Sequence, residues 1–412
     1  MEFRPIRSLT YGVFLIVGVY FALQTEYYQH KVAGFKVPQQ HVVSQNSETT
    51  EGKLIDLLAP KIFILSLFPI EADVWYKHLP GSDLGDLFAQ TISVPGLSPL
   101  YPDIHCTLDG SICQVTTGMS EINAATTITS VILSRKFDLR KTYFLLAGIA
   151  GVNPNHGTLG SVALARFAVQ VALQYEIDPR EIPPDWKTGY FSFGTRSPNE
   201  YPTELYGTEV FELNEALRDV AFGLASTATL NDTADIQEYR DKYRTDGVRY
   251  RSATESPSVI KCDATTSDVY FSGNYLAEAF EDLTNLWTNG LAKYCMSAME
   301  DNAILEALVR FHVHDMVDFS RVILLRTGSN FDRPPPGVDA FTHLRGEHLN
   351  GIEIAAANIY LAGLEIVKGI LGDWDEVFAK GIEPSNYLGD ILGTLGGVPD
   401  FVPVAGEGAQ VI

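Results

Sequence analysis

Apolar residues along the chain follow two different spacings. Continuous apolar runs of strand length occur at 61–68, 143–147, 159–165 and 322–325. Apolar residues recur at helical spacing within 212–230, 275–287, 303–311 and 352–371. A continuous run indicates a strand buried on both faces, and helical spacing indicates an amphipathic helix. Strands that alternate with helices predict an α/β fold with a largely parallel core.

The N-terminal residues predict entry into the secretory pathway. Arg4 and Arg7 precede an apolar run at 11–23, which is the arrangement of a signal peptide. The run is shorter than the roughly 20 residues that span a bilayer comfortably, yet no clear cleavage site follows it. We therefore assign 1–25 to a signal peptide or an uncleaved signal anchor, and interpret the polar segment 26–58 as a stem or linker.

A single folded domain is expected over residues 59–412. Within it, the segment at about 178–268 becomes rich in proline, tyrosine and charge. That segment is too long for a plain loop, so we interpret it as an insertion that covers or flanks the site, or that only decorates the periphery. In the long apolar segment 352–371, Glu353 and Asn358 interrupt the apolar face. This favours a helix of the folded core over a lone membrane span.

Charge and short motifs narrow the classes of partner. A net charge of −21 over 412 residues makes nucleic acid an unsuitable partner, because phosphate binding requires clustered Lys and Arg. The chain has no Cys-x-x-Cys or His-Glu-x-x-His pattern, so we expect no metal. Asn231 begins the tripeptide Asn-Asp-Thr, an acceptor for N-glycosylation in a secreted protein.

Four cysteines occur in the chain. Cys106 and Cys113 flank a segment that contains Asp109 and Gly110, a pair typical of a two-residue hairpin turn. Such a turn would place the two cysteines opposite each other, within disulfide range, although two buried free thiols are also consistent with the pattern. Cys262 and Cys295 are far apart in sequence, and no pairing is predicted for them.

A carboxylate at the start of an apolar helix is the first candidate for a binding residue. Glu300 precedes the helix expected from 303, and it could accept two neighbouring hydroxyl protons. Asn330 follows the strand at 322–325 and could offer an amide donor and a carbonyl acceptor to a heterocycle. The simpler interpretation is that Glu300 complements the helix dipole and that Asn330 makes a turn.

A carboxylate at a strand end, a small-residue turn and a glycine-containing stretch add further candidates. Glu71 lies just past the run 61–68, where open α/β sheets bind ligands, although it could equally be a first-turn helix carboxylate. Thr117, Gly118 and Ser120 form a small-residue turn between a strand and a helix that suits an anion or a sugar. The apolar run 143–147 ends in a second glycine-containing stretch, at which a backbone can approach a ligand closely: Gly148, Ile149, Ala150 and Gly151.

Several of these motifs occur in the order and spacing of the nucleoside phosphorylase and nucleosidase superfamily. They are the segments 117–125, 148–151, 299–300 and 329–330. More closely, the segments 147–154, 158–163, 176–186 and 299–303 resemble the purine nucleoside permease family of fungi and bacteria. The resemblance covers most of residues 59–412.

The resemblance implies a three-layer α/β/α sandwich around a twisted mixed sheet, with purine nucleosides as ligands and without a cofactor. It implies that Met299 and Glu300 hold the ribose and that Ser329 and Asn330 face the base. Residues 148–151 would line the base pocket, and Thr117, Gly118 and Ser120 would lie at the phosphate or nucleophile end. The superfamily has an acid where this chain has Asn330, which can hydrogen-bond but cannot deliver a proton.

Glu71 stands where phosphorylases of the superfamily bring an arginine for phosphate. The nucleosidase branch has a glutamate there that positions a water, so we expect hydrolysis in preference to phosphorolysis, with phosphate a possible co-substrate. The alternative is a nucleoside-binding component of transmembrane transport without catalysis. We expect a homo-oligomer at the cell surface, outside the cell or anchored to the membrane, with membrane contact only through an uncleaved N-terminal segment.

Overall fold

The computed structural model describes residues 57–244, 248–347, 351–402 and 410–411. Within these segments, thirteen strands form one mixed sheet. Those strands are β1 Ile62–Ser66, β2 Gln90–Ser93, β3 Asp103–Cys106, β4 Ile112–Thr116, β5 Tyr143–Val152, β6 Val162–Ala165, β7 Phe167–Gln170, β11 Val210–Glu212, β12 Val259–Lys261, β13 Asp263–Thr266, β14 Tyr294–Ala298, β15 Val322–Phe331 and β16 Gly389–Asp390. The predicted signal sequence and the predicted stem, except for its last two residues, 57 and 58, lie outside the described residues.

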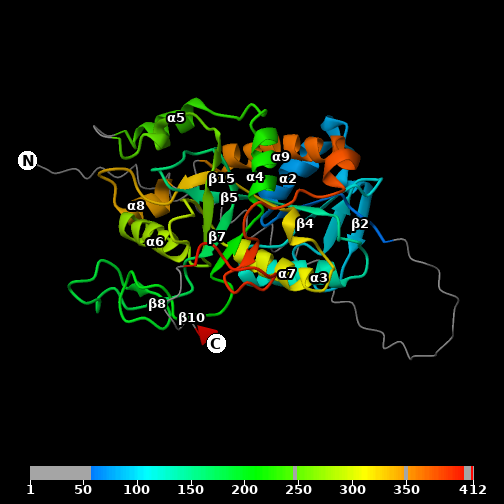
Figure 1. Cartoon of the computed structure of the whole chain (residues 1–412). Helices are drawn as coiled ribbons and strands as arrows, with labels where there is room; N and C mark the ends of the chain where they lie inside the picture. Colours follow the sequence, from blue (N-terminus) through cyan, green and yellow to red (C-terminus); the bar gives the residue numbers. More distant parts are fainter. Residues whose placement is uncertain (1–56, 245–247, 348–350, 403–409, 412) are drawn as a thin grey trace, which may run out of the picture. The chain divides into compact units, whose positions relative to one another are not determined.

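Helices cover both faces of this sheet (Figure 1). One layer contains α2 Pro69–His78, α4 Glu215–Ala225 and α9 Ile352–Gly372, and the other contains α3 Glu121–Leu133 and α7 Asp301–His312. Further helices are α5 Ala234–Asp241, α6 Asn274–Trp287 and α8 Ala340–Thr342. The predicted three-layer α/β/α arrangement around a mixed sheet is confirmed.

The residues of β1 show how the sequence builds these layers. Every residue of the strand is buried, as expected for a strand covered on both faces. Ile62 and Ile64 belong to the apolar cluster that contains Trp75 of α2. Phe63 and Leu65 belong to the cluster on the opposite face, with Ile128, Ile304 and the rest of the α3 and α7 layer. Alternate side chains of a strand point to opposite faces, so a continuous apolar run was needed.

Strand β5 is the junction of the sheet. Its first half pairs with β1 in parallel, its last residues pair with β14 in antiparallel, and β15 runs parallel along most of its length. Both β5 and β15 extend beyond the apolar runs that predicted them, to Val152 and Phe331. The apolar runs at 143–147 and 322–325 therefore predicted only the first part of each strand. Ladder pairing overrides the low strand propensity of glycine, serine and asparagine in the remaining part, with a register irregularity between Gly328 and Asn330.

Part of the range assigned to an insertion belongs to the sheet. Strand β11 pairs with β7, β12 with β6, and β13 with both β7 and β14. These strands are short and their apolar stretches are brief, which is why residue pattern alone did not separate them from loop. The segment at about 171–199, by contrast, carries only the two-residue strands β8 Tyr175–Glu176 and β9 Tyr190–Phe191, which pair with each other. Another small pair joins β10 Glu204–Leu205 and β17 Gln410–Val411.

Helix α9 passes the length and composition test for a membrane span, and within the described residues it does so alone. Its most apolar window is 67% buried inside the fold. Asn358, one of the two interrupting polar residues, is fully buried and donates to the carbonyl of Gly160 at 2.8 Å. The helix is packed as a core element of this domain.

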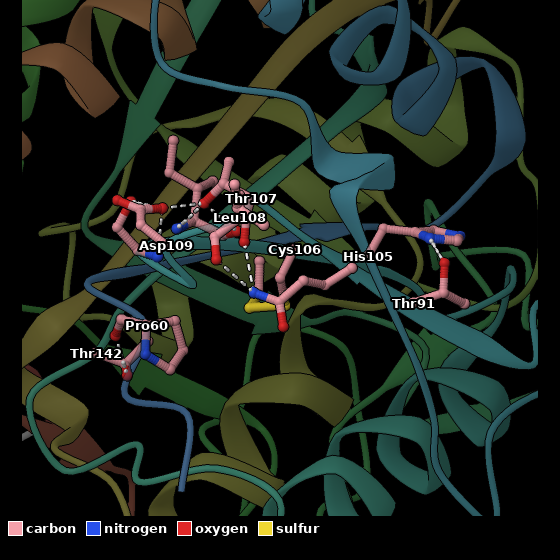
Figure 2. Close-up of a disulfide and its surroundings, with 12 residues drawn as sticks. Pro60, Thr91, His105, Cys106, Thr107, Leu108, Asp109 and Thr142 are labelled. Atoms are coloured by element: carbon pink, nitrogen blue, oxygen red, sulfur yellow. Dashed lines mark hydrogen bonds between the residues drawn. A yellow bond between two sulfur atoms is a disulfide. The ribbon is translucent and has the colours of Figure 1, made fainter. Parts of the chain in front are cut away.

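Both pairs of cysteines form disulfides. Cys106 and Cys113 occupy directly opposite positions of β3 and β4, with Cα atoms 4.1 Å apart, and Figure 2 shows the bond beside the hairpin. The connection is a four-residue loop closed by the Thr107 N–H on the Ile112 carbonyl, not a two-residue turn at Asp109. The cysteine register is the same in either case. The second bond joins Cys262 and Cys295, a pairing that the sequence did not predict.

Candidate functional site

Carboxylates at the ends of two strands meet in the interior of the domain. Glu71 follows β1 in the first turn of α2, and Glu300 follows β14 as the residue before α7. They are only 2% and 4% exposed. Arg326 of β15 lies between them and interacts electrostatically with both. The fold thus brings together two residues that are separated by most of the domain's sequence.

Glu71 is held by three backbone N–H groups. Its Oε2 accepts from Leu67 at 2.7 Å and from Phe68 at 3.1 Å, and its Oε1 accepts from Ile149 of β5 at 2.7 Å. The bond to Phe68 is the side-chain-to-N-cap half of a capping box. The helix-start interpretation of Glu71 is therefore correct, and the same side chain also reaches the neighbouring strand. Burial raises the pKa of Glu71 to about 7, although Arg326 and the backbone donors oppose the rise.

Glu300 does not cap its own helix. Its Oε1 accepts from the Ser120 N–H at 3.1 Å and its Oε2 accepts from Nη2 of Arg326 at 3.3 Å. The interpretation of Glu300 as a helix-dipole partner therefore explains none of its hydrogen bonds. Burial raises the pKa of Glu300, and Arg326 and the Ser120 N–H oppose this rise. The carboxylate points into the same cluster as Glu71.

Arg326 and Asp301 are site residues that the sequence analysis missed. The Nε of Arg326 donates to Oδ1 of Asp301 at 3.0 Å, its Nη2 also donates to that oxygen, and its Nη1 donates to the Ile149 carbonyl at 3.1 Å. The two acids beside it hold the pKa of Arg326 above its usual range against the effect of burial. The sequence held one signal for this pair. Arg326 directly follows the apolar run at 322–325, and an arginine is rarely buried without a partner.

Counting acceptor positions shows what the two glutamates can still bind. An ionised carboxylate has about four acceptor positions. Three donors occupy Glu71, which leaves one position on its Oε1. One donor occupies each oxygen of Glu300, which leaves one position on each. Glu300 can therefore accept two hydroxyl groups at once, and Glu71 can accept one further proton donor such as water.

The small-residue turn predicted at 117–120 lies against Glu300. Gly118 and Ser120 have φ values of +87° and +83°, a conformation that favours glycine and strains serine. This conformation aims the Ser120 N–H at Glu300, while the Ser120 hydroxyl donates to Asp268 at 2.7 Å. Thr117 is fully buried and donates to the Gly118 carbonyl. The turn therefore holds Glu300, the candidate ribose-binding residue. Asp268 is a further contact that the sequence analysis missed.

The predicted base-binding run divides into two parts. A Cβ built on Gly148 would lie 2.4 Å from Nη1 of Arg326 and 3.0 Å from Glu71, so this position belongs to the carboxylate cluster, as does the Ile149 backbone. A Cβ on Gly151 would lie 2.3 Å from Oγ of Ser297 and 3.3 Å from Nδ2 of Asn330. Glycine at both positions lets β5 approach these side chains closely.

Ser329 and Asn330 lie at the second part. The single proton of the Ser329 hydroxyl is shared between the Ala150 carbonyl at 3.0 Å and Oδ1 of Asn330 at 2.9 Å. The Asn330 amide donates to the Phe331 carbonyl at 3.2 Å. One N–H and one acceptor position of the carboxamide are left. The turn interpretation of Asn330 is wrong, because the residue lies within β15. Met299 is partly buried between β14 and Glu300.

The fold and these contacts define an α/β sandwich with a buried carboxylate–guanidinium site at the ends of its central strands. A family profile described as Purine nucleoside permease (NUP) matches residues 59–383. The chain belongs to this family, as its resemblance implied. A purine nucleoside permease of Candida albicans is 45% identical over 87% of each chain, and a probable purine nucleoside permease of Schizosaccharomyces pombe is 36% identical over 76% of this chain and 90% of its own.

Solved structures with a similar fold are nucleosidases and a hydrolase. A 5'-methylthioadenosine/S-adenosylhomocysteine nucleosidase of Neisseria meningitidis aligns with a TM-score of 0.45 and 13% identity, over 76% of this chain and all of the other. A futalosine hydrolase of Helicobacter pylori aligns with a TM-score of 0.43 and 15% identity, over 74% of this chain and 98% of the other.

Proposed function

We propose that this protein binds purine nucleosides and hydrolyses their N-glycosidic bond. This proposal depends on the two buried glutamates, because Glu300 has two free acceptor positions and Glu71 has one. A ribose presents two adjacent hydroxyl groups, which match the two positions on Glu300. A water bound at the position on Glu71 would be the nucleophile. The names of the relatives support a purine nucleoside as the ligand.

In the proposed reaction, the bond between C1′ and the base breaks as the sugar gains oxocarbenium character. The water adds its oxygen to C1′, and Glu71 accepts the released proton. Asn330 would hydrogen-bond the base but has no acidic proton to give, so the departing base takes its proton from solvent. With a pKa of about 7 for Glu71, activity should rise as the pH increases through that value, because the base must be ionised.

The charge of the cluster favours water over phosphate. Arg326 already donates to Asp301, Glu300 and the Ile149 carbonyl. Glu71, Glu300 and Asp301 together outnumber this one guanidinium. A phosphate would therefore enter a site of net negative charge whose cation is engaged. Neutral water meets no such repulsion.

A product assay tests this proposal. The full-length protein is incubated with inosine, guanosine or adenosine, with and without phosphate, and the sugar product is identified. We expect free base and ribose independently of phosphate. Glu71→Gln should lower the rate by at least about a hundredfold while retaining nucleoside binding, Glu300→Ala should abolish binding, and Glu353→Gln on the exposed side of α9 should change neither. Strict dependence on phosphate, with ribose 1-phosphate as product, would refute hydrolysis.

A second candidate is a nucleoside-binding component of uptake that does not cleave its ligand. The amide at Asn330, which cannot protonate a leaving base, favours it together with the permease names of the relatives. Both candidates place the protein in the secretory pathway and at the cell surface, and its two disulfides suit such an oxidising compartment. Saturable nucleoside binding without any free base, and uptake that survives Glu71→Gln, would favour this second candidate.

A further inference from the structure

A second cavity, of about 620 Å³, lies between α6 and the segment at about 171–199. None of the residues described above for the nucleoside site lines it. The segment contains the motif Pro-Pro-Asp-Trp at 183–186, which contributed to the family resemblance but has no role in the proposed hydrolysis. This volume is within the range of small-molecule sites. The lining residues therefore give the chemistry of a separate ligand.

Aromatic side chains form the walls, and they are held in place before any ligand arrives. Trp186 packs edge-on against Phe191 with ring centroids 5.4 Å apart, and Tyr190 packs against Phe280 at 5.2 Å. Tyr175 and Phe191 face each other across the β8–β9 ladder. Below them, Trp287 of α6 donates to Ser192 at 3.0 Å. Such ordered rings offer flat apolar surfaces at low entropic cost.

The charged groups of the cavity are mostly acidic. Asp185, Glu278 and Asp282 line it with a single ammonium, Lys187. Glu278 pairs with Arg249 at 2.5 Å, whereas Asp185 and Asp282 have no such partner among the described residues. Burial, together with Glu281 and Glu278, raises the pKa of Asp282, and Lys187 opposes the rise. The region thus has a negative potential that a cation would relieve.

A buried amide adds an acceptor that lacks a partner. Gln174 lines the cavity and is only 8% exposed. Its Nε2 donates to the Val171 carbonyl at 2.6 Å, and its Oε1 has no hydrogen-bond partner in the described part of the chain. A buried polar atom without a partner is unfavourable by about 1–3 kcal/mol and calls for an explanation. The accessible surface of this oxygen is below 1 Å², so a ligand in the cavity reaches it only after the side chain rotates.

We propose that this cavity binds a small organic cation, in which an ammonium group is joined to a flat apolar body. Trp186 and Tyr190 contact the body, and Asp282 and Asp185 attract the ammonium. Attraction between a cation and an aromatic face adds to the effect of the carboxylates. The site is independent of the proposed nucleoside chemistry and would give the protein a second class of ligand.

Two probes of nearly equal shape test the proposal on the full-length protein. Isothermal titration calorimetry compares 2-phenylethylamine, which is cationic at pH 7, with 2-phenylethanol, which is neutral. We expect one saturable amine site per chain and an affinity for the amine at least about tenfold higher than for the alcohol. Excess inosine should leave amine binding unchanged, because the two sites are separate. Methyl glucoside serves as a third probe, since aromatic walls with acceptors also suit sugars.

Matched variants locate the site. Asp282→Asn should bring the affinities for the two phenyl probes to within about threefold of each other, and Trp186→Ala should weaken both. Asp375→Asn, an exposed acid elsewhere in the chain, is the control and should change neither. Retained inosine binding would show that the variants are folded. The proposal is refuted by no saturable amine binding, by equal affinity for amine and alcohol, by an unaffected Asp282→Asn variant, or by binding of the glucoside alone.

Discussion

Replacing Arg326 tests whether one guanidinium holds the buried acids together. Arg326→Met keeps much of the side-chain volume but removes the hydrogen bonds to Asp301, Glu300 and the Ile149 carbonyl. Those acids are almost fully buried. Removing one partner of a buried ion pair typically destabilises a protein by about 3–5 kcal/mol, because the remaining charge is left without compensation. We expect a loss in that range at pH 8, where the acids must ionise or shift their pKa.

The assay is urea unfolding of the full-length protein, followed by circular dichroism at pH 8 and pH 5.5. The loss should be smaller at pH 5.5, because Glu71 and Glu300, whose pKa values are already raised, can take up protons. Arg310→Met is the matched control, since its pair with Glu306 on α7 leaves the arginine 73% exposed. Exposed pairs contribute about 0–1 kcal/mol. Equal losses for the two variants, or a loss independent of pH, would refute the reasoning.

Other predictions concern single positions. In the wild type, the raised pKa of Glu71, from 4.5 to about 7, implies stability that is fully present below pH 4.5 and lost as the pH rises through 7. Glu71→Gln should flatten that fall by up to about 3 kcal/mol, and an unchanged urea-unfolding profile would contradict the assignment. Gly151→Ala should weaken nucleoside binding in calorimetry, because its Cβ would meet Ser297 at 2.3 Å. Adding Ser297→Gly should restore binding. Unchanged binding by Gly151→Ala alone would contradict the close approach of β5 to Ser297. Asn231→Gln should remove one glycan when the protein is expressed in a eukaryotic secretory pathway, because Asn231 is exposed; an unchanged mass after glycosidase treatment would exclude modification there.

The sequence predicted the layers of the fold because each rests on local spacing. The run at 61–68 became a strand buried on both faces, and the segment 352–371 became a core helix. Strand ends were predicted less well. Residues 148–151 and 326–330 have turn-like composition, but pairing between β5 and β15 keeps them extended. Such pairing joins segments far apart in the chain, and one sequence does not show it.

The site was predicted only in part for the same reason. Glu71, Glu300 and Ser120 could be selected because each lies at the end of a strand or the start of a helix. Arg326 lies in the middle of β15, and Asp301, although it begins α7, carries no signal of its own until Arg326 is placed against it. Since Arg326 contacts both Asp301 and Glu300, it determines how strongly charged the site is. A residue such as Arg326, which neutralises neighbouring acids, is identified by its contacts in the fold, and the residue pattern does not show those contacts.

The structure also limits how a member of a permease family can take part in transport. A helix that crosses a bilayer alone presents its side chains to lipid on all sides, so it cannot at the same time be packed inside a folded domain. Within the described residues, α9 alone has the length for this, but Ile359 and Ile366 are fully buried against the rest of the fold. If α9 left the fold, the apolar residues that now cover it would face water, at about 1.5–3 kcal/mol for each side chain that becomes fully exposed, and the Asn358 bond to Gly160 would be lost. Insertion of α9 would therefore dismantle the layer that contains α2 and Glu71, and we expect α9 to stay packed in the domain.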